Sequence, residues 1–298
     1  MTAVATHTAS AGEALDRPDR LHPLRQFVSD RLAATGLAIV VLLSLAALFA
    51  PVLAPYDPTV IDPLRGLEGS SRDHLLGTDE LGRDVLSRLL MGARWSLGIA
   101  FLATSCVMTV GTLVGLIAGY LGGWVDAVVM RVVDALLALP NLVLYLAIIG
   151  TLGPGIRNVF IALVVISWAS YARVMRGLVL SVRERAFVRA SRSLGAGNSR
   201  LMLRHILPNV ISPIVVLATL QLGGTILALA ALGFFGLGAQ PPTPEWGTMI
   251  NQGRLFLQTN PGLMVYPGIA ISLAVLGFNL MGDGLRDVLD PQLARQSR

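Results

Sequence analysis

The sequence contains no lysine, one cysteine and only four histidines among its 298 residues. Cys106 lies inside an apolar run and has no second cysteine to pair with, so we interpret it as a small buried side chain. The histidines are scattered, and no group of Cys, His and acidic residues has the spacing of metal ligands. We therefore expect neither a metal site nor an intrachain disulfide.

Two kinds of catalytic motif are also missing. No GxxxxGKS/T segment is present to hold the phosphates of a nucleotide, so we expect this chain neither to bind ATP or another cofactor nor to hydrolyse ATP. No Ser/His/Asp or Cys/His arrangement is recognisable. These two absences predict a protein that is not an enzyme and has no catalytic residue.

Charged residues are scarce as well. They make up 14% of the chain, apolar residues make up 54%, and the mean hydropathy is +0.67, a composition typical of a polytopic membrane protein. The net charge of +5 comes from arginines that flank apolar segments. They form no single patch with aromatic residues, so membrane topology explains them better than nucleic-acid binding does.

Six apolar runs are long enough to cross about 30 Å of hydrocarbon as helices. We therefore predict an all-α fold with six transmembrane helices, the third of them bent at Pro140. Gly111, Gly115 and Gly119 recur every four residues in the second run, a spacing that permits close helix packing. The runs cover residues 33–53, 95–119, 128–152, 158–179, 209–236 and 263–282.

These runs divide the chain into five parts. Residues 85–91 have an amphipathic pattern, from which we predict a helix along the membrane surface. The parts are a cytoplasmic tail (1–32), a first transmembrane helix (33–54), an extracytoplasmic segment with this amphipathic helix (55–94), a five-helix core with a cytoplasmic loop at 180–208 (95–282), and a cytoplasmic tail (283–298).

The distribution of arginine predicts the orientation in the membrane. With the N-terminus inside, 16 of the 23 arginines fall in cytoplasmic segments and seven fall outside. Cytoplasmic loops carry the excess of basic residues, so both termini are expected in the cytoplasm.

Two charged residues open the third apolar run. Arg131 and Asp134 are three residues apart, a spacing that allows an ion pair on one helix, and we predict a structural pair near the cytoplasmic surface. A proton relay is the alternative, because ionisable residues near membrane segments are often functional. The centres of the other spans contain no acids, which weakens that alternative.

The loop from Arg183 to Asn209 contains six arginines and one acid. In lipid these arginines would cost about 15 kcal/mol, so the loop must lie in water. We predict two short helices, the first ending at Gly195 and Gly197, the second capped by Asn198 or Ser199 and ending before Pro208. A basic amphipathic pair of helices is typical of a docking surface, although an ordinary positively charged cytoplasmic loop fits the charge equally well.

The spacing within this loop resembles the EAA loop of importer-type ABC permeases. In that family the loop forms a coupling helix, which docks on a cytoplasmic ATPase subunit. Here an arginine stands at the place of the family's Glu, a serine replaces the second Ala, and the isoleucine is one place from its usual position. The matching residues are Arg189, Ala190, Ser191, Gly195, Ile206, Leu207 and Pro208.

Other segments resemble one subfamily, the C-type permeases of dipeptide, oligopeptide and nickel importers. The most specific is LGTDELGRD at residues 76–84, followed by GAQPPTPEWGTM and by FNLMGDGLRDVLDPQL at 278–293. The resemblance covers about residues 30–293. It implies a type I importer permease fold with six membrane helices in the cell membrane.

The resemblance also implies partners. These are a homologous B-type permease, two ATPases that hold ATP and Mg²⁺, and an extracytoplasmic substrate-binding protein. In the family the outer segments face the binding protein, so the candidate docking residues here are Asp79, Arg83, Asp84 and Glu245. A peptide is the expected substrate, because the GAQPPTPEWGTM segment is most similar to dipeptide members.

Three alternatives remain open at this point. Nickel, free or chelated, is the second substrate candidate, because substrate selection lies largely with the binding protein. An ion-coupled secondary carrier would transport without ATP and would need a buried acid in mid-span. A membrane receptor or scaffold would bind its partner without uptake.

Overall fold

The computed structural model describes residues 27–289, and every regular element in this range is a helix. The predicted all-α architecture is confirmed. The elements are α2 (Arg31–Leu48), α3 (Ala50–Leu53), η1 (Pro63–Arg65), α4 (Val85–Leu121), α5 (Gly123–Leu137), α6 (Asn141–Leu152), α7 (Ile156–Arg183), α8 (Ala186–Ser193), α9 (Asn198–Arg200), η2 (Leu201–Ile206), α10 (Leu207–Phe234), α11 (Trp246–Gly253), η3 (Arg254–Phe256) and α12 (Gly262–Leu289).

Six membrane spans account for this order. Five helices are long and apolar enough to cross a membrane, and α5 and α6, which meet at 90°, give a sixth span if the bent pair crosses as one. The bend lies at Pro140, as the sequence predicts. Proline has no backbone N–H to donate and disfavours helical geometry in the residue before it, which favours a break in the helix at this position.

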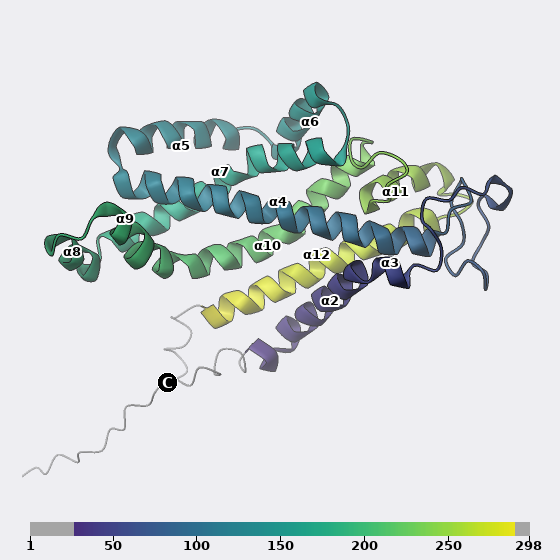
Figure 1. The fold of residues 1–298 in the computed structure, drawn as a ribbon, viewed down its shortest axis with the longest axis horizontal. Coiled ribbons are helices and arrows are strands. Elements are labelled where there is room, and N and C mark those ends of the chain that lie inside the picture. The colour runs from purple at the N-terminus through teal and green to yellow at the C-terminus, as the bar shows by residue number, and fades with distance from the viewer. Residues whose placement is uncertain (1–26, 290–298) are drawn as a thin grey trace, which may run out of the picture.

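The long helices lie along one axis (Figure 1). The short helices α8 and α9 are at one end, and α11 and the loop after α3 are at the other. Helices α2 and α12 pack side by side, α4 packs against α7, and α5 and α6 also contact α7. The two ends therefore carry the loops, and the apolar helices form the region between them.

Glycines bring α4 and α7 together, as their spacing predicts. A Cβ on Gly111 would lie 2.4 Å from the Cβ of Tyr171, and one on Gly115 would lie 2.4 Å from the carbonyl oxygen of Ala172. No side chain fits at such distances, so the close contact between these helices depends on glycine.

Two predicted boundaries are wrong. Residues 85–91 are not a separate surface helix but the first turns of α4, because Asp84 caps the helix by accepting a 2.7 Å hydrogen bond from the amide of Ser87. The core extends beyond residue 282, since α12 continues to Leu289. Most of the predicted tails, residues 1–26 and 290–298, lies outside the described residues.

Candidate functional site

The arginine-rich loop begins with the short helix α8, as predicted, and Gly195 follows it. The φ of Gly195 is +83°, a conformation that glycine adopts without strain, so the chain turns here at little cost. Within α8, Val188 is fully buried, whereas Phe187 and Leu194 are exposed. The helix is therefore held by one side and presents both apolar and basic residues on its outer side.

The second half of the loop differs from the prediction. Gly197 is the residue before α9, and the side chain of Asn198 instead accepts a 2.8 Å hydrogen bond from the hydroxyl of Tyr120. The chain then continues through the π-helical turn η2 into α10, and Pro208 lies in the first turn of α10. The helix does not end before Pro208, because the first turn needs no N–H donor and accepts proline.

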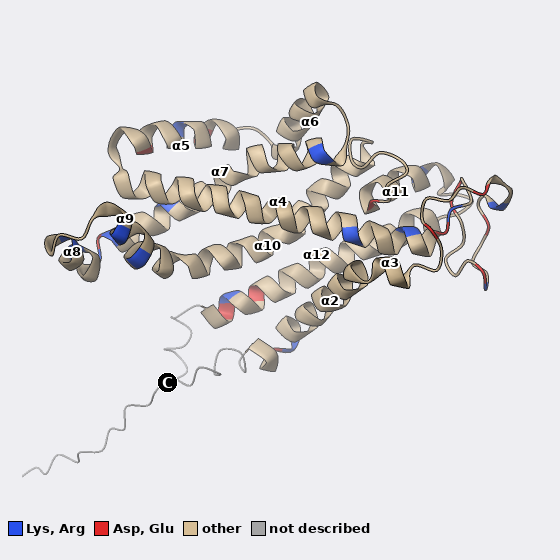
Figure 2. Cartoon of the chain, viewed as in Figure 1, with Lys and Arg blue, Asp and Glu red and all other residues tan. Residues whose placement is uncertain are grey.

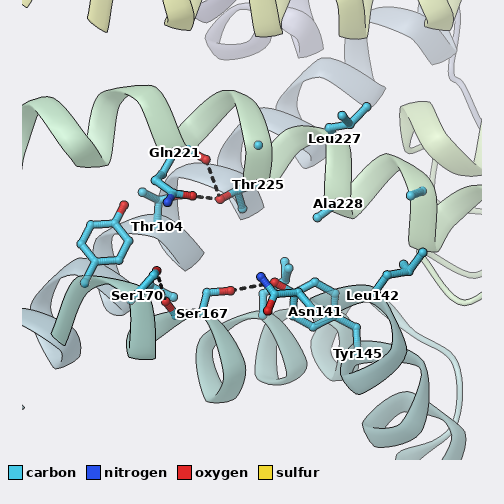
Figure 3. A pocket seen from close by; sticks show the side chains of 15 residues that line it. Thr104, Asn141, Leu142, Tyr145, Ser167, Ser170, Gln221, Thr225, Leu227 and Ala228 are labelled. Carbon is cyan, nitrogen blue, oxygen red and sulfur yellow. Dashed lines mark hydrogen bonds between the residues drawn. The ribbon is translucent and has the colours of Figure 1, made fainter. Parts of the chain in front are cut away.

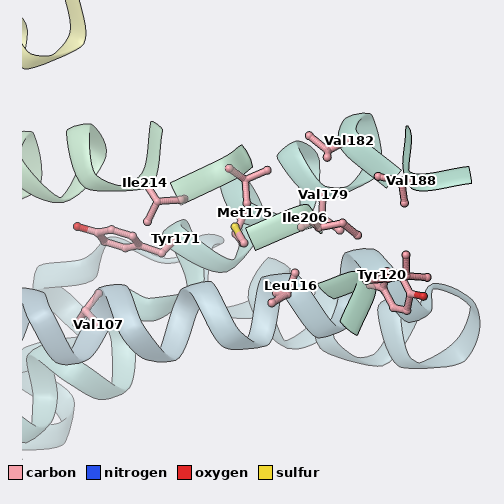
Figure 4. Close-up of a cluster of buried hydrophobic side chains, with 12 residues drawn as sticks. Val107, Leu116, Tyr120, Tyr171, Met175, Val179, Val182, Val188, Ile206 and Ile214 are labelled. Carbon is pink, nitrogen blue, oxygen red and sulfur yellow. The ribbon is translucent and has the colours of Figure 1, made fainter. Parts of the chain in front are cut away.

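Buried side chains join this loop to the membrane helices (Figure 4). Val188, Leu201 and Ile206 are fully buried in one cluster with Tyr120 of α4 and Val182 of α7. A close-packed cluster transmits displacement, because its side chains cannot compress. Movement of α8 would therefore be passed to α4, α7 and α10.

Most arginines of the loop have no acidic partner in the part of the chain that the structure describes. Arg183 contacts Glu184 at 3.2 Å and donates to the carbonyl oxygen of Gly119, and the guanidinium of Arg192 lies 5.6 Å from the ring centre of Tyr120. The others are exposed and without an ion pair, namely Arg185, Arg189, Arg200 and Arg204. We call the outer surface formed by Arg185, Phe187, Arg189, Arg192 and Leu194 the basic docking surface.

The predicted loop residues divide by exposure. The exposed ones are Arg189, Ala190, Gly195 and Pro208; Ser191 and Leu207 are half-buried and Ile206 is buried. The isoleucine therefore anchors the loop, and the exposed residues are the ones that a partner can touch.

At the opposite end, Asp79 is the centre of a buried ion cluster. Its carboxylate contacts the guanidinium Nε of Arg83 at 2.7 Å and that of Arg88 at 3.2 Å. Arg88 also donates a 3.0 Å hydrogen bond to Gln252, which joins α4 to α11. Figure 2 shows charged residues gathered in this loop and around α8 and α9.

The proposed docking of a binding protein through Asp79, Arg83, Asp84 and Glu245 is wrong for these side chains, because all four are at most 5% exposed. Asp84 accepts from the amide of Ser87 and contacts His74 at 2.9 Å. The buried side chains of the LGTDELGRD segment therefore fold the loop after α3 onto α4.

Glu245 caps α11 from inside the protein. Its carboxylate accepts hydrogen bonds from the amides of Gly247 and Thr248 at 2.8 and 2.9 Å and from the hydroxyl of Ser96 at 3.3 Å. Burial raises the pKa of this carboxyl above its ordinary value, although these hydrogen bonds act in the opposite direction. Trp246 is also buried, and its ring N–H donates to the carbonyl oxygen of Leu89.

The predicted ion pair between Arg131 and Asp134 is not formed. Asp134 pairs with Arg173 of α7, and Asp126 pairs with Arg176 of the same helix. The acidic residues of α5 therefore form ion pairs with arginines of the neighbouring helix α7, and not with an arginine of their own helix. Both pairs fasten α5 to α7, and Arg131 is exposed without an ion pair among the described residues.

The membrane helices line an open cavity of about 430 Å³ that the sequence did not predict (Figure 3). Helices α4, α6, α7 and α10 line it, and no lining residue is charged. Two hydrogen bonds cross its wall: Thr104 to Thr225 at 3.1 Å, and Tyr145 to Ser167 at 2.8 Å. The available signal was a polar residue in the middle of several apolar runs.

The chain does not close this cavity by itself. Asn141, Leu142 and Leu227 line it and are exposed. Of these only Asn141 is polar, and a polar group exposed to hydrocarbon is unfavourable, so water or another protein suits its surroundings better than lipid does.

Comparison with known proteins agrees with this architecture. A family model described as a binding-protein-dependent transport system inner membrane component matches residues 111–295. A second model, described as the N-terminal TM domain of oligopeptide transport permease C, matches residues 24–68. Together the two models cover most of the chain.

Individual relatives are similar over nearly their whole length. The dipeptide transport system permease protein of Alkalihalophilus pseudofirmus is 44% identical, covering 90% of this chain and 88% of that protein. The di/tripeptide transport system permease protein of Pseudomonas aeruginosa is 46% identical, covering 97% and 98%. The glutathione transport system permease protein of Pectobacterium atrosepticum is 43% identical, covering 90% of each chain. This chain therefore belongs to the family of binding-protein-dependent transport system inner membrane components, and it is a permease subunit of the ABC importer type.

Proposed function

We propose that this chain is the permease subunit of an ATP-driven importer of di- and oligopeptides. The observation that carries this proposal is its similarity, over 90% or more of its length, to permeases named for dipeptides, di- and tripeptides and glutathione, itself a modified tripeptide. Nickel import has no comparable support among these relatives.

The exposed side of the cavity supports a second permease as partner. A homologous B-type subunit would cover Asn141, Leu142 and Leu227, and the substrate would pass between the two subunits. Transmembrane helices associate through such polar contacts, because lipid tails cannot satisfy them.

The basic docking surface supports an ATPase as the cytoplasmic partner of this chain, and the second of the two ATPases would dock on the homologous permease. They would bind ATP and Mg²⁺ and carry out hydrolysis, and this chain would contribute no catalytic group. Closure of the ATPases would move α8, and the buried cluster around Val188 and Ile206 would pass that movement to α4, α7 and α10. Access to the cavity would then alternate between the two sides of the membrane.

The remaining assignments follow from this arrangement. Both termini lie in the cytoplasm, the loop around Asp79 lies outside, and a substrate-binding protein delivers the peptide there. Because Asp79 and Glu245 are buried, the binding protein contacts other, exposed residues at this end.

A pair of glycine variants tests the coupling role. In Gly195→Val a β-branched residue must adopt φ +83°, which costs about 1–3 kcal/mol, whereas Gly197 has an ordinary φ of −68° and open space around it. We expect Gly195→Val to lower both the amount of co-purified ATPase and ATP-driven uptake, and Gly197→Val to retain most of both. If Gly195→Val leaves assembly and uptake intact, the coupling role is wrong.

A further inference from the structure

The cavity lies at the same depth on three helices. Thr104, Ser167 and Gln221 are near the middle of α4, α7 and α10, each of which crosses the membrane. The shorter helix α6 begins at the cavity with Asn141, directly after the bend at Pro140. Polar residues from four helices are therefore brought together far from either end of the bundle.

Several polar groups at the cavity have no partner in the described chain. The side-chain amides of Asn141 and Gln221 make no hydrogen bond to another described residue. Tyr171 also lines the cavity; it is 1% exposed, and its hydroxyl is buried without a hydrogen-bond partner. Unsatisfied polar groups inside a membrane are unfavourable, so an occupant that bonds to them would stabilise this arrangement.

The chemistry of these groups limits the occupant. Amides and hydroxyls donate and accept hydrogen bonds without charge, which matches the N–H and C=O groups of a peptide bond. The first turn of α6 has no side-chain cap, so its free N–H groups suit a carboxylate such as a peptide C-terminus. No carboxylate, thiolate or imidazole lines the cavity to bind a bare metal ion.

We propose that this cavity is a binding site for the backbone of the transported peptide, with Asn141 and Gln221 as its hydrogen-bonding groups. The site rests on the proposed function and adds its place and its selectivity. It recognises peptide groups and disregards side-chain charge. Its volume of about 430 Å³ is within the range of small-molecule sites.

Cysteine labelling of the full importer complex in proteoliposomes tests this site. Because Cys106 is the only cysteine of the chain, Cys106→Ser provides a background without other thiols in this subunit. Ser167→Cys then places a thiol in the cavity wall, and Ser272→Cys places one on an exposed part of α12. The reagent is a charged methanethiosulfonate, and this subunit is separated from its partners before labelling is measured.

We expect Ser167→Cys to react faster than Ser272→Cys by about tenfold, because a thiol in apolar surroundings forms little thiolate. A tripeptide supplied with the binding protein and ATP should slow the labelling of Ser167→Cys several-fold, and nickel chloride should not. Equal labelling of the two variants, or protection by nickel but not by peptide, would overturn the site.

A second variant gives a readout that does not depend on labelling. Gln221→Leu keeps the apolar packing of α10 but removes one amide. We expect the maximal rate of peptide uptake to fall several-fold while the affinity of the binding protein for peptide stays unchanged. An unchanged uptake rate would contradict the role of Gln221.

The two proposals fail in different ways. If the parent complex imports no peptide, the proposed function is wrong and the site falls with it. If it imports peptide while Ser167→Cys is unprotected and Gln221→Leu is unaffected, only the site is wrong.

Discussion

The carboxylate of Asp126 on α5 accepts two hydrogen bonds from the guanidinium of Arg176 on α7, at 2.5 and 2.6 Å. This paired contact fastens the broken span to the bundle. The pair of Asp134 and Arg173 lies on the same two helices but is far more exposed, with side chains 65% and 50% accessible. The first pair should therefore contribute more to stability than the second.

Asparagine substitution compares the two pairs. Asp126→Asn should lower the free energy of unfolding by about 1.5–3 kcal/mol, because it removes hydrogen bonds to a charged group. Asp134→Asn should lower it by less than about 1 kcal/mol, as for other exposed ion pairs. Thermal unfolding of the detergent-solubilised protein measures both, and equal effects would contradict the assignment.

Glycine substitutions on α4 should have opposite signs. A methyl group on Gly115 would meet the backbone of Ala172, so Gly115→Ala should destabilise the protein by about 1–3 kcal/mol. Gly98 on the same helix has open space around it, and Gly98→Ala should stabilise by about 0.5–1 kcal/mol. Melting temperature and the yield of assembled complex report both changes. A neutral Gly115→Ala would show that α4 and α7 are not in close contact.

Charge reversal tests the basic docking surface. Arg189→Glu should weaken binding of the ATPase subunits about fivefold, as expected for the loss of about 1 kcal/mol at a surface ion pair, and Arg189→Lys should bind nearly as well as the parent. High salt should weaken the parent complex and leave Arg189→Glu less affected.

Arg131→Glu is the matched control, because Arg131 is exposed on α5 away from the loop. If Arg131→Glu weakens ATPase binding as much as Arg189→Glu does, the effect arises from the total charge of the protein and not from a contact at Arg189. If Arg189→Glu changes adhesion to anionic lipid vesicles but not ATPase binding, the surface contacts lipid and not the ATPase.

Glu245 should make stability depend on pH. Burial raises its pKa above 4.5 in the folded protein, so the folded state binds this proton more tightly than the unfolded state. The stabilisation by this group is fully present below pH 4.5 and is lost as the pH rises through the folded-state pKa. In Glu245→Gln this dependence disappears, although one acceptor is lost at every pH.

The measurement is the melting temperature of parent and variant from about pH 4.5 upward. The melting temperature of the variant should rise relative to that of the parent as the pH increases, because only the parent then ionises a buried carboxyl. A difference that stays constant over this range would show that Glu245 does not titrate there.

The sequence is sufficient for the features that depend on local chemistry. Apolar runs of membrane length predict the spans, and Pro140 predicts the bend. The spacing of Gly111, Gly115 and Gly119 predicts close helix packing, and the structure identifies α7 as the partner. The position of α8 before Gly195 also follows from the sequence, because both a basic amphipathic helix and the glycine that ends it are determined by neighbouring residues.

Features that depend on distant contacts were not accessible in this way. Spacing within one helix favours Arg131 as the partner of Asp134, but it gives no information about Arg173 on another helix. The contact of Arg88 with Gln252 joins α4 to α11 through residues far apart in the chain, so no local pattern displays it. The cavity was missed because its polar residues come from four helices and no single segment displays the pattern.

The central claim is tested most directly by uptake into proteoliposomes that contain the complete importer and its binding protein. Dipeptides, tripeptides, glutathione and nickel chloride are compared as substrates. Each is tested with and without ATP on the side of the membrane that carries the ATPases. We expect small peptides to be taken up and to stimulate ATP hydrolysis, and uptake to cease without ATP or without the binding protein. Stimulation by nickel alone, or peptide uptake that continues without ATP, would contradict the account.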